Sequence, residues 1–423
     1  MIKNLIKLFK NKELRKSMLT IFFWLLVFRL IAAIPIPNVD LNQIKTFLEQ
    51  SKVFGLFDIF TGGAFGNLSI GLLGVSPYIS ASIIMQLVVI IIPSLKEVFH
   101  ENGEEGRRKF EKWTKYLTLP LTVLQAVGIL NILRMQKIIT INSPLELWRN
   151  VLLLTAAAFV IVFIGEIITQ KKLGNGISLI IFSGIIISLP QSIFATVMSA
   201  QTLFAWIGVA LFFLIMLIMV VAIVYLTEGE RRLTVSYAKH VRGNKMYGGV
   251  TTFLPLKVNQ AGVIPIIFAL SILTFPALIS QMLATTNLTF LVTASNFLTT
   301  LIENKVFYAS IYFILVFLFT FFYTSITFEP KEISDNLQKN GGFIPGYRPG
   351  ENTVSHLSKV SKKITLFGAI FLGLVAVLPM ALEKVTNVTT FEIGGTSLLL
   401  IVAIAIEIKN AIEAQLAMRE YDY

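Results

Sequence analysis

The feature that most constrains this chain is a series of long apolar runs that carry few charges. About 20 helical residues cross a hydrocarbon core of about 30 Å, so an apolar run of about 18 or more residues predicts a membrane helix. Ten such runs stand at 17–34, 75–92, 116–133, 148–169, 176–197, 203–226, 261–283, 306–327, 364–382 and 396–414. Only 14% of the residues are charged, against about a quarter in soluble proteins. We therefore expect an all-α membrane protein with ten transmembrane helices.

The basic residues predict the orientation of these helices. Lys and Arg cluster in the N-terminal segment and in the loops after the second, fourth, sixth and eighth runs, whereas the intervening loops are nearly free of them. Positive residues stay on the cytoplasmic side, so both termini are predicted to be cytoplasmic and the net charge of +12 reflects topology. The basic segment MIKNLIKLFKNKELRK lacks a small-residue cleavage site, and we interpret it as a retained cytoplasmic segment, not a signal peptide.

The number of runs permits a division into two halves. Five runs fall in residues 1–190 and five in 191–423, and the second half carries long cytoplasmic loops at about 227–259 and 328–363. Transport proteins often consist of two halves related as an inverted repeat, with the pathway between them. The halves show no evident sequence similarity, so this expectation depends on the number of runs alone.

The segment GLFDIFTGGAFGNLSIGLLG, which begins at Gly55, is apolar but too interrupted to cross a membrane. Its central glycines each weaken a helix by about 1 kcal/mol relative to alanine. Asp58 and Asn67 are costly against lipid. Irregular backbone at membrane depth must be surrounded by protein or water. The residues alone therefore leave two placements open: a short re-entrant helix inside a cavity, or an external loop on the membrane surface.

The sequence contains no constellation of catalytic residues. It has no cysteine, no GxxxxGK[ST] phosphate loop and no GxSxG elbow. The three histidines lie in predicted cytoplasmic loops, outside any HExxH pattern: His100, His240 and His356. We therefore expect no enzymatic activity, no cofactor and no metal site.

Charged residues inside the predicted helices are few. Arg29 is the one basic residue well inside a run, and an intramembrane charge is a functional candidate by default, although structural pairing or snorkelling remains the alternative. Glu166 and Glu407 lie near predicted cytoplasmic helix ends. A coupled solute carrier would need buried charged or polar clusters at mid-membrane. An intramembrane enzyme would need a Ser/Lys, Ser/His, paired Asp or HExxH arrangement. The sequence favours a passive conduit driven by a partner.

Eight stretches spread over nearly the whole chain are more specific. They are VFRLIAAIPIP from Val27, GVSPYISASIIMQL from Gly74, EEGRRKFEKWTKY from Glu104, GEIITQKKLGNGISLIIFSGI from Gly165, GERRLTVSYAKH from Gly229, LPLKVNQAGVIPIIFA from Leu254, GGFIPGYRPGENT from Gly341 and GGTSLLLIVAIAIE from Gly394. In their order and spacing they resemble the SecY/Sec61-alpha family of protein-translocon channel subunits. The resemblance implies an hourglass channel made of two five-helix halves that open laterally to lipid.

The family closes the waist of the channel with a ring of aliphatic side chains. Matched motif by motif, the ring positions are Val75, Ile79, Ile177, Ile181, Ile267 and Leu400. Val75 and Leu400 depart from the commonest isoleucine. Residues four apart lie on one helix face, about a turn from each other, which suits the pairs 75/79 and 177/181. An apolar constriction excludes water and ions by dewetting. Without the family, ordinary packing would explain aliphatic residues at these positions.

The resemblance also assigns the interrupted segment and two polar residues. Residues 55 to about 68 match the family's plug, a re-entrant helix that seals the resting channel. The expected plug residues are Gly55, Phe57, Ile59, Phe60, Gly62, Gly63 and Phe65. The second and seventh helices would flank the lateral gate, where Gln86 and Asn259 match polar positions. Hydrogen bonding between helices, worth about 1 kcal/mol, remains an alternative role for these two amides.

The remaining expectations concern partners. The resemblance implies docking of the ribosome and the SecA ATPase on the long loops, through Arg231, Arg232, Lys239 and Arg348. It also implies the subunits SecE and SecG, the accessory proteins SecDF and YidC, signal sequences, unfolded preproteins and membrane lipids. The expected location is the bacterial cytoplasmic (plasma) membrane. Both a housekeeping channel and an accessory paralogue with few substrates fit the sequence.

Overall fold

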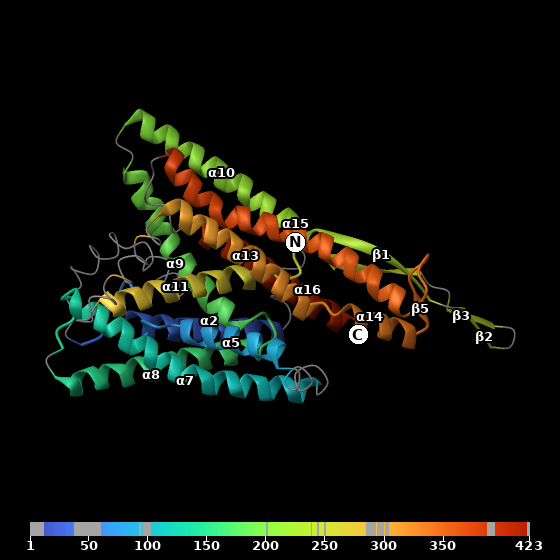
Figure 1. Ribbon diagram of the computed structural model, residues 1–423, viewed down its shortest axis with the longest axis horizontal. Coiled ribbons are helices and arrows are strands. Elements are labelled where there is room, and N and C mark those ends of the chain that lie inside the picture. The colour runs from blue at the N-terminus through green and yellow to red at the C-terminus, as the bar shows by residue number, and fades with distance from the viewer. Residues whose placement is uncertain are drawn as a thin grey trace.

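The computed structural model describes residues 12–37, 61–92, 103–141, 143–199, 202–237, 239–242, 245–248, 251–284, 304–386 and 394–420, with the single residues 95, 293 and 300. Each of the ten predicted runs coincides with a helix (Figure 1). These helices are α2 (Lys12–Ala33), α5 (Ser76–Ile91), α7 (Gly103–Met135), α8 (Pro144–Thr169), α9 (Gly176–Ser199), α10 (Leu203–Glu228), α11 (Ile264–Ala284), α13 (Lys305–Thr327), α15 (Glu351–Thr386) and α16 (Gly394–Glu420).

Several of these helices can cross a membrane by length and hydropathy. Among the described residues, six qualify: α2, α7, α8, α10, α13 (in a stretch, Val306–Lys339, that also takes in the polar α14, Pro330–Lys339) and α15. Shorter apolar helical stretches lie in α5, α9 and α11, at Ser76–Val89, Gly176–Pro190 and Ile264–Leu273. The chain is therefore a mostly helical protein with several membrane-spanning segments.

Local sequence explains where three of the helices begin. The side chains of Ser143, Thr202 and Asn304 accept hydrogen bonds from the first free backbone N–H groups of α8, α10 and α13. Small polar residues are preferred at this position because they satisfy donors that have no partner within the helix. Pro144 then occupies the first turn of α8, where its missing N–H costs nothing. In these three helices, the polar residue just before the first turn therefore determines where the helix begins.

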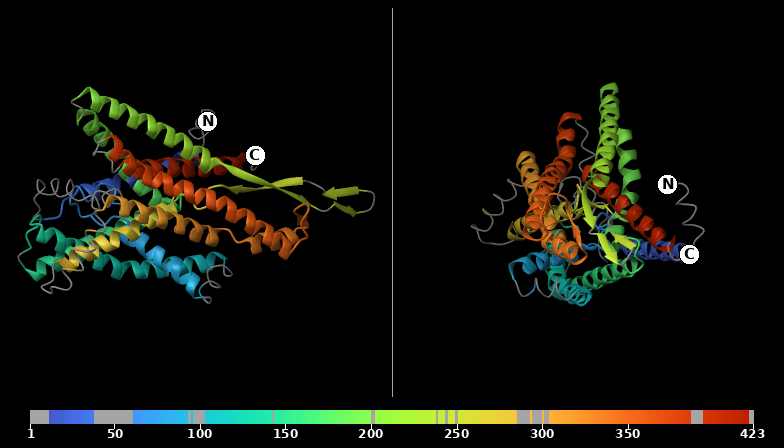
Figure 2. Two further views of the ribbon diagram at one scale, coloured as in Figure 1. Left: turned by 45° about the horizontal axis from the view of Figure 1, so that its top comes forward. Right: turned by 90° about the vertical axis from the view of Figure 1, so that its right-hand side faces the viewer.

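The largest hydrophobic cluster joins both halves of the chain. It collects buried side chains from α2, α5, α8, α9, α10, α11, α13, α15 and α16. A second cluster joins residues 65–73 to α7 and α8. A third lies outside the apolar spans, between the strands and α14 and α15. Figure 2 shows the long helices running side by side, with the strands at one end of the molecule.

The two long loops contain structure that the hydropathy pattern did not predict. An antiparallel sheet has the order β4–β1–β5, formed by β1 (Glu230–Tyr237), β4 (Thr251–Lys257) and β5 (Gly342–Phe343). Leu233 pairs with Leu254 in its register. A hairpin of β2 (Lys239–Arg242) and β3 (Lys245–Gly248) extends beyond the helices (Figure 2). Because β5 comes from the second loop, the two loops fold into one unit.

Residues 61–74 form successive turns packed inside the protein. Backbone hydrogen bonds of 2.8 Å join Ile36 N to the Leu68 carbonyl and Ile70 N to the Ile34 carbonyl. Five aliphatic and aromatic side chains of the segment have no exposed surface: Ala64, Phe65, Leu68, Leu72 and Leu73. The expected plug helix is not helical over 61–68, because Gly62 and Gly63 adopt positive φ angles of 68° and 80° that a right-handed helix excludes.

Candidate functional site

The six aliphatic positions expected to form a ring lie in the largest hydrophobic cluster. Val75 immediately precedes α5 and Ile79 lies in its first turn, while Ile177 and Ile181 come from α9. Ile267 comes from α11 and Leu400 from α16. Five of these side chains are at most 6% exposed, and the half-buried Ile177 packs against the same cluster. Residues from four distant parts of the sequence thus meet in one apolar region.

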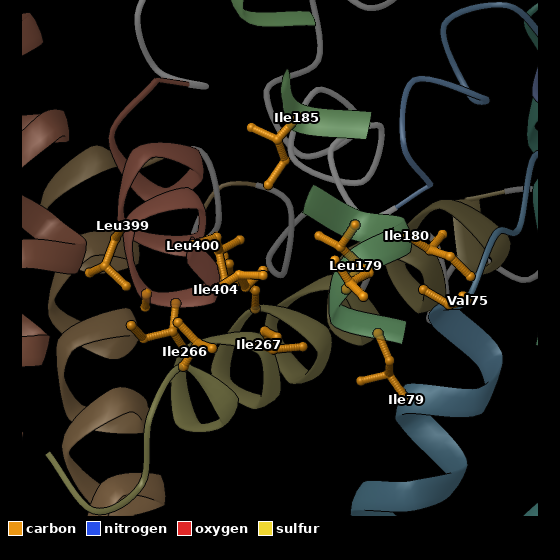
Figure 3. Close-up of a cluster of buried hydrophobic side chains, with 14 of the residues drawn as sticks. Val75, Ile79, Leu179, Ile180, Ile185, Ile266, Ile267, Leu399, Leu400 and Ile404 are labelled. Atoms are coloured by element: carbon orange, nitrogen blue, oxygen red, sulfur yellow. The ribbon is translucent and has the colours of Figure 1, made fainter. Parts of the chain in front are cut away.

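Neighbouring side chains enlarge this region. Figure 3 shows Leu179, Ile180 and Ile185 of α9, Ile266 of α11, and Leu399 and Ile404 of α16 gathered with Val75, Ile79, Ile267 and Leu400. Sequence reasoning missed these additional members. Ile404 could have been found, because it lies four residues after Leu400 and therefore on the same helix face. Ile404 is 1% exposed.

The chemistry of this region is exclusion of water. The six expected ring residues and the neighbours labelled in Figure 3 have aliphatic side chains, which offer no hydrogen-bond donor, acceptor or charge to a passing molecule. Buried aliphatic surface of this kind resists hydration, and a hydrophobic constriction blocks ions by dewetting. Within the described ranges, no group of three or more His, Asp or Glu side chains is placed to hold a metal ion.

The expected plug residues are described only in part. Gly55, Phe57, Ile59 and Phe60 lie outside the described residues. Gly62 and Phe65 are buried, and Gly63 is half-buried. Phe65 belongs to the cluster shared with α7 and α8, and its N–H donates to Thr61 Oγ1 over 3.2 Å. The described end of the segment is therefore enclosed by helices of the first half.

Of the two amides expected at a gate, Gln86 lies on α5 and Asn259 lies shortly before α11, and α5 contacts α11. Their hydrogen bonds are local. Gln86 Nε2 donates to Ser82 Oγ over 3.1 Å, and Asn259 Nδ2 donates to the Gly262 carbonyl over 3.2 Å. The structure thus brings the two helices together but does not join the two amides directly.

Comparison with known proteins identifies the family. A family model described as SecY matches residues 69–409. The chain belongs to the SecY family. It is 39% identical to the protein translocase subunit SecY of Thermotoga maritima, over 98% of this chain and 95% of that protein. It is 37% identical to the protein translocase subunit SecY of Escherichia coli strain K12, over 97% of this chain and 93% of that protein.

Solved structures of channels share the fold. A structure described as a protein-conducting channel aligns with a TM-score of 0.61 at 16% identity, over 93% of this chain and 91% of that one. Canine Sec61 in a ribosome–channel complex aligns with a TM-score of 0.58 at 16% identity, over 93% and 91%. This SecY family member is a multi-pass membrane protein, and its function is that of the protein-conducting channel of the Sec translocon. It is a channel subunit and not an enzyme.

The basic residues expected to dock partners lie on the unit formed by the two loops. Arg231 and Arg232 are exposed on β1, and Arg232 Nε lies 2.7 Å from Glu230 Oε1. Lys239 lies on β2. Arg348 is exposed between β5 and α15.

A small cavity of about 260 Å³ lies beside Arg348. It is lined by Gly346, Tyr347, Arg348, Asn352, Ser355, His356 and Lys359. The ring of His356 stacks on Tyr347 with centroids 3.8 Å apart. Partial desolvation lowers the pKa of His356, and the positive charges of Arg231 and Lys359 lower it further. The structure therefore gathers basic residues from both loops around one histidine.

Proposed function

We propose that this SecY family member passes unfolded secretory polypeptides through a ring formed by Val75, Ile79, Ile177, Ile181, Ile267 and Leu400. The observation that carries the proposal is the meeting of these side chains, from four distant parts of the sequence, in one buried apolar cluster. Aliphatic side chains can close around a chain of any sequence because they provide no fixed polar partner. When the channel is empty, the same side chains exclude water and ions.

The proposed architecture has ten membrane spans in two halves, residues 1–190 and 191–423, related as an inverted repeat. The ten helices that coincide with the ten apolar runs support the number of spans. The contact between α5 and α11 supports a lateral gate at this boundary, with Gln86 and Asn259 nearby. On another side of the boundary, α9 of the first half packs against α16 of the second. An apolar signal sequence or membrane helix would leave for lipid between α5 and α11.

The proposed plug is the segment from Gly55 to about residue 68. The burial of its described end supports a re-entrant placement over a surface loop, since Phe65 and Leu68 have no exposed surface. Non-helical backbone at membrane depth needs exactly such enclosure by protein, because lipid cannot satisfy its polar groups. Displacement of this segment would precede passage of a polypeptide.

The proposed energy source is a cytoplasmic partner, SecA or a ribosome, that docks on the unit formed by the two loops. The exposed arginines Arg231, Arg232 and Arg348 support this, because a largely RNA surface such as the ribosome favours exposed positive charge. We also propose that both termini lie in the cytoplasm of a bacterium, with the chain in its plasma membrane, because positively charged loops stay on the cytoplasmic side. SecE and SecG would complete the assembly, and SecDF and YidC would act beside it.

Site-specific photo-crosslinking tests this proposal. A photoreactive residue at Ile181 should capture the mature part of a precursor stalled in membranes that contain SecA. The same residue at Ile186, which is 43% exposed on α9, is the control and should give no crosslink to the mature part. A precursor that is bound at the membrane but is not captured at Ile181 would show that the ring assignment is wrong or that the channel rejects general precursors.

A further inference from the structure

The one basic residue well inside an apolar run makes a defined contact. Arg29 lies on α2 and is half-buried. Its Nη1 donates a hydrogen bond to the backbone carbonyl of Gly62, 33 residues further along the chain. A charged side chain at membrane depth is costly unless it is paired or reaches water. The carbonyl of Gly62 therefore gives the guanidinium a polar partner on the interrupted segment.

The backbone around Gly62 is shaped for this contact. Gly62 and Gly63 adopt φ angles of 68° and 80°, a region that residues with a side chain rarely adopt. A Cβ atom built on Gly62 would lie 2.8 Å from the ring of Phe28, the residue before Arg29. A Cβ atom on Gly63 would lie 3.6 Å from Arg29 Nη1. The two glycines thus let the chain approach α2 closely enough for the arginine to reach the carbonyl.

The same turn is pressed against α9 on its other side. A Cβ atom built on Gly184 would lie only 2.1 Å from Gly62 Cα, so the two glycine backbones are in direct contact. Gly184 lies three residues after Ile181, and residues three apart share a helix face. The turn at Gly62 is therefore seated about one helical turn from a proposed ring position.

The described end of the segment has two kinds of attachment. Backbone hydrogen bonds at Ile36–Leu68 and Ile70–Ile34 join it to the chain that follows α2. The contact from Arg29 is instead made by a side chain, nearer the residues expected to form the plug. A side-chain contact can be released without disturbing the paired backbone at 68–70. The described segment therefore has one end, at 68–70, that is fixed by backbone pairing, and another end, at Gly62, whose contact can be released.

We propose that Arg29 is a positioning residue that holds the turn at Gly62–Gly63 in its resting seat between α2 and α9, and that this contact must break before the channel opens. The proposal rests on the function proposed above, because it assigns the resting seal to the segment that contains Gly62. The guanidinium takes no part in conducting the polypeptide. It sets how readily the seal is released by a bound signal sequence.

Thiol accessibility in the resting, assembled translocon tests this role. The chain has no cysteine, so Ala64→Cys provides a single reporter at a side chain with no exposed surface. The measurement is its rate of modification by a membrane-impermeant maleimide added from outside. Loss of a hydrogen bond from a charged donor corresponds to about a tenfold change in an equilibrium. We expect Arg29→Met to raise the rate about tenfold, Arg29→Lys to raise it less, and the exposed control Arg134→Met to leave it unchanged.

A second variant separates release of the turn from loss of the arginine. Gly184→Ala keeps Arg29 but places a methyl group 2.1 Å from Gly62 Cα, which forces the turn at Gly62 to move. It should raise the modification rate as Arg29→Met does. If the Arg29→Met protein fails to accumulate, the modification rates of Gly184→Ala and Arg29→Lys test the proposal in its place. A resting ion leak through the same variants should rise in parallel.

Equal modification rates for Ala64→Cys alone and for Ala64→Cys combined with Arg29→Met or with Arg29→Lys would overturn the proposal. The crosslink at Ile181 is measured in the same membranes, so that failure of the ring assignment can be told from failure of the positioning role of Arg29. If that crosslink is present while the modification rates do not differ, the proposed conducting role is supported and the positioning role of Arg29 is wrong. If the modification rates differ while the protein with Arg29 intact gives no crosslink at Ile181, the positioning role of Arg29 is supported and the ring assignment is wrong.

Discussion

A single side chain at the centre of the apolar cluster acts through its size and its lack of polarity. Ile181 has no exposed surface and contributes no donor or acceptor. Water in such a region loses hydrogen bonds without gaining new partners, so the proposed ring is expected to stay dry when the channel is empty. A polar atom at the same place would give water a partner and lower the free energy of the hydrated state.

We therefore expect Ile181→Asn to raise the resting ion conductance of the reconstituted translocon. A buried polar group that gains a water partner changes the free energy of hydration by about 1–3 kcal/mol, or roughly ten- to hundredfold in the hydrated population. Ile186→Asn on the exposed face of α9 is the matched control and should leave conductance unchanged. Equal conductance in the two variants would place the constriction elsewhere.

His356 allows a test of the electrostatics of the surface that we propose for docking. Desolvation lowers its pKa below the usual value of 6.5, and the charges of Arg231 and Lys359 lower it further. A histidine whose pKa is lower in the folded than in the unfolded state favours folding while it is neutral. Its contribution to stability is therefore present above pH 6.5 and is lost as the pH falls through the folded pKa.

NMR titration of labelled histidine in the assembled protein checks this direction. We expect His356 to titrate below 6.5, and Lys359→Gln to move its pKa upwards because one nearby positive charge is removed. The chain has only three histidines, so His356→Gln assigns the signal. A pKa at or above 6.5 would mean that Arg231 and Lys359 do not face the ring as described.

At the scale of the elements, hydropathy predicted the helices and could not predict the strands. Ten apolar runs coincide with ten helices, and six helices among the described residues are long and apolar enough to cross a membrane, where backbone bonds have to be satisfied internally. β1 pairs with β5, which lies more than 100 residues further along the chain. Such long-range pairing leaves little signal in the local sequence of a strand such as Glu230–Tyr237.

The interrupted segment was also predictable only in part. Its glycines and polar residues excluded a crossing helix, but residues alone left a re-entrant helix and a surface loop equally open. Turns at Gly62 and Gly63 depend on contacts with Phe28 and Gly184, which no local pattern reveals. The ring positions likewise came from the family resemblance, because aliphatic residues in membrane helices mostly serve packing.

The connection between α8 and α9 provides a test at this scale. Thr169 Oγ1 donates to the Gly165 carbonyl over 2.8 Å and accepts from Gly176 N–H over 2.9 Å. A Cβ atom on Gly176 would lie 1.9 Å from the Gly165 carbonyl oxygen. We expect Gly176→Ala to lower the free energy of unfolding by about 2 kcal/mol, because overpacking costs about 1–3 kcal/mol.

The matched control for this substitution is Gly165→Ala. Its Cβ atom would meet the side chain of Ile177 at 3.2 Å, and a side chain can shift more easily than a backbone carbonyl. Thermal unfolding of the purified protein in detergent should therefore rank Gly176→Ala as clearly less stable than Gly165→Ala. The reverse order would show that the turn between α8 and α9 is not packed as described.

For the whole molecule, the account depends on where the two halves meet. The largest hydrophobic cluster contains side chains from α5 and α9 of the first half and from α11 and α16 of the second. A core shared by two halves normally stabilises one fixed arrangement. Family membership shows a protein-conducting channel. Under the proposed function, the same shared core parts when a polypeptide enters.

The most direct test is a cryo-EM structure of the assembled translocon with a stalled precursor. We expect continuous polypeptide density between α5, α9, α11 and α16, encircled by Ile79, Ile181, Ile267 and Leu400, with the turn at Gly62 displaced from Gly184. Precursor density on another path, with these side chains still packed against one another as in the resting cluster, would contradict it.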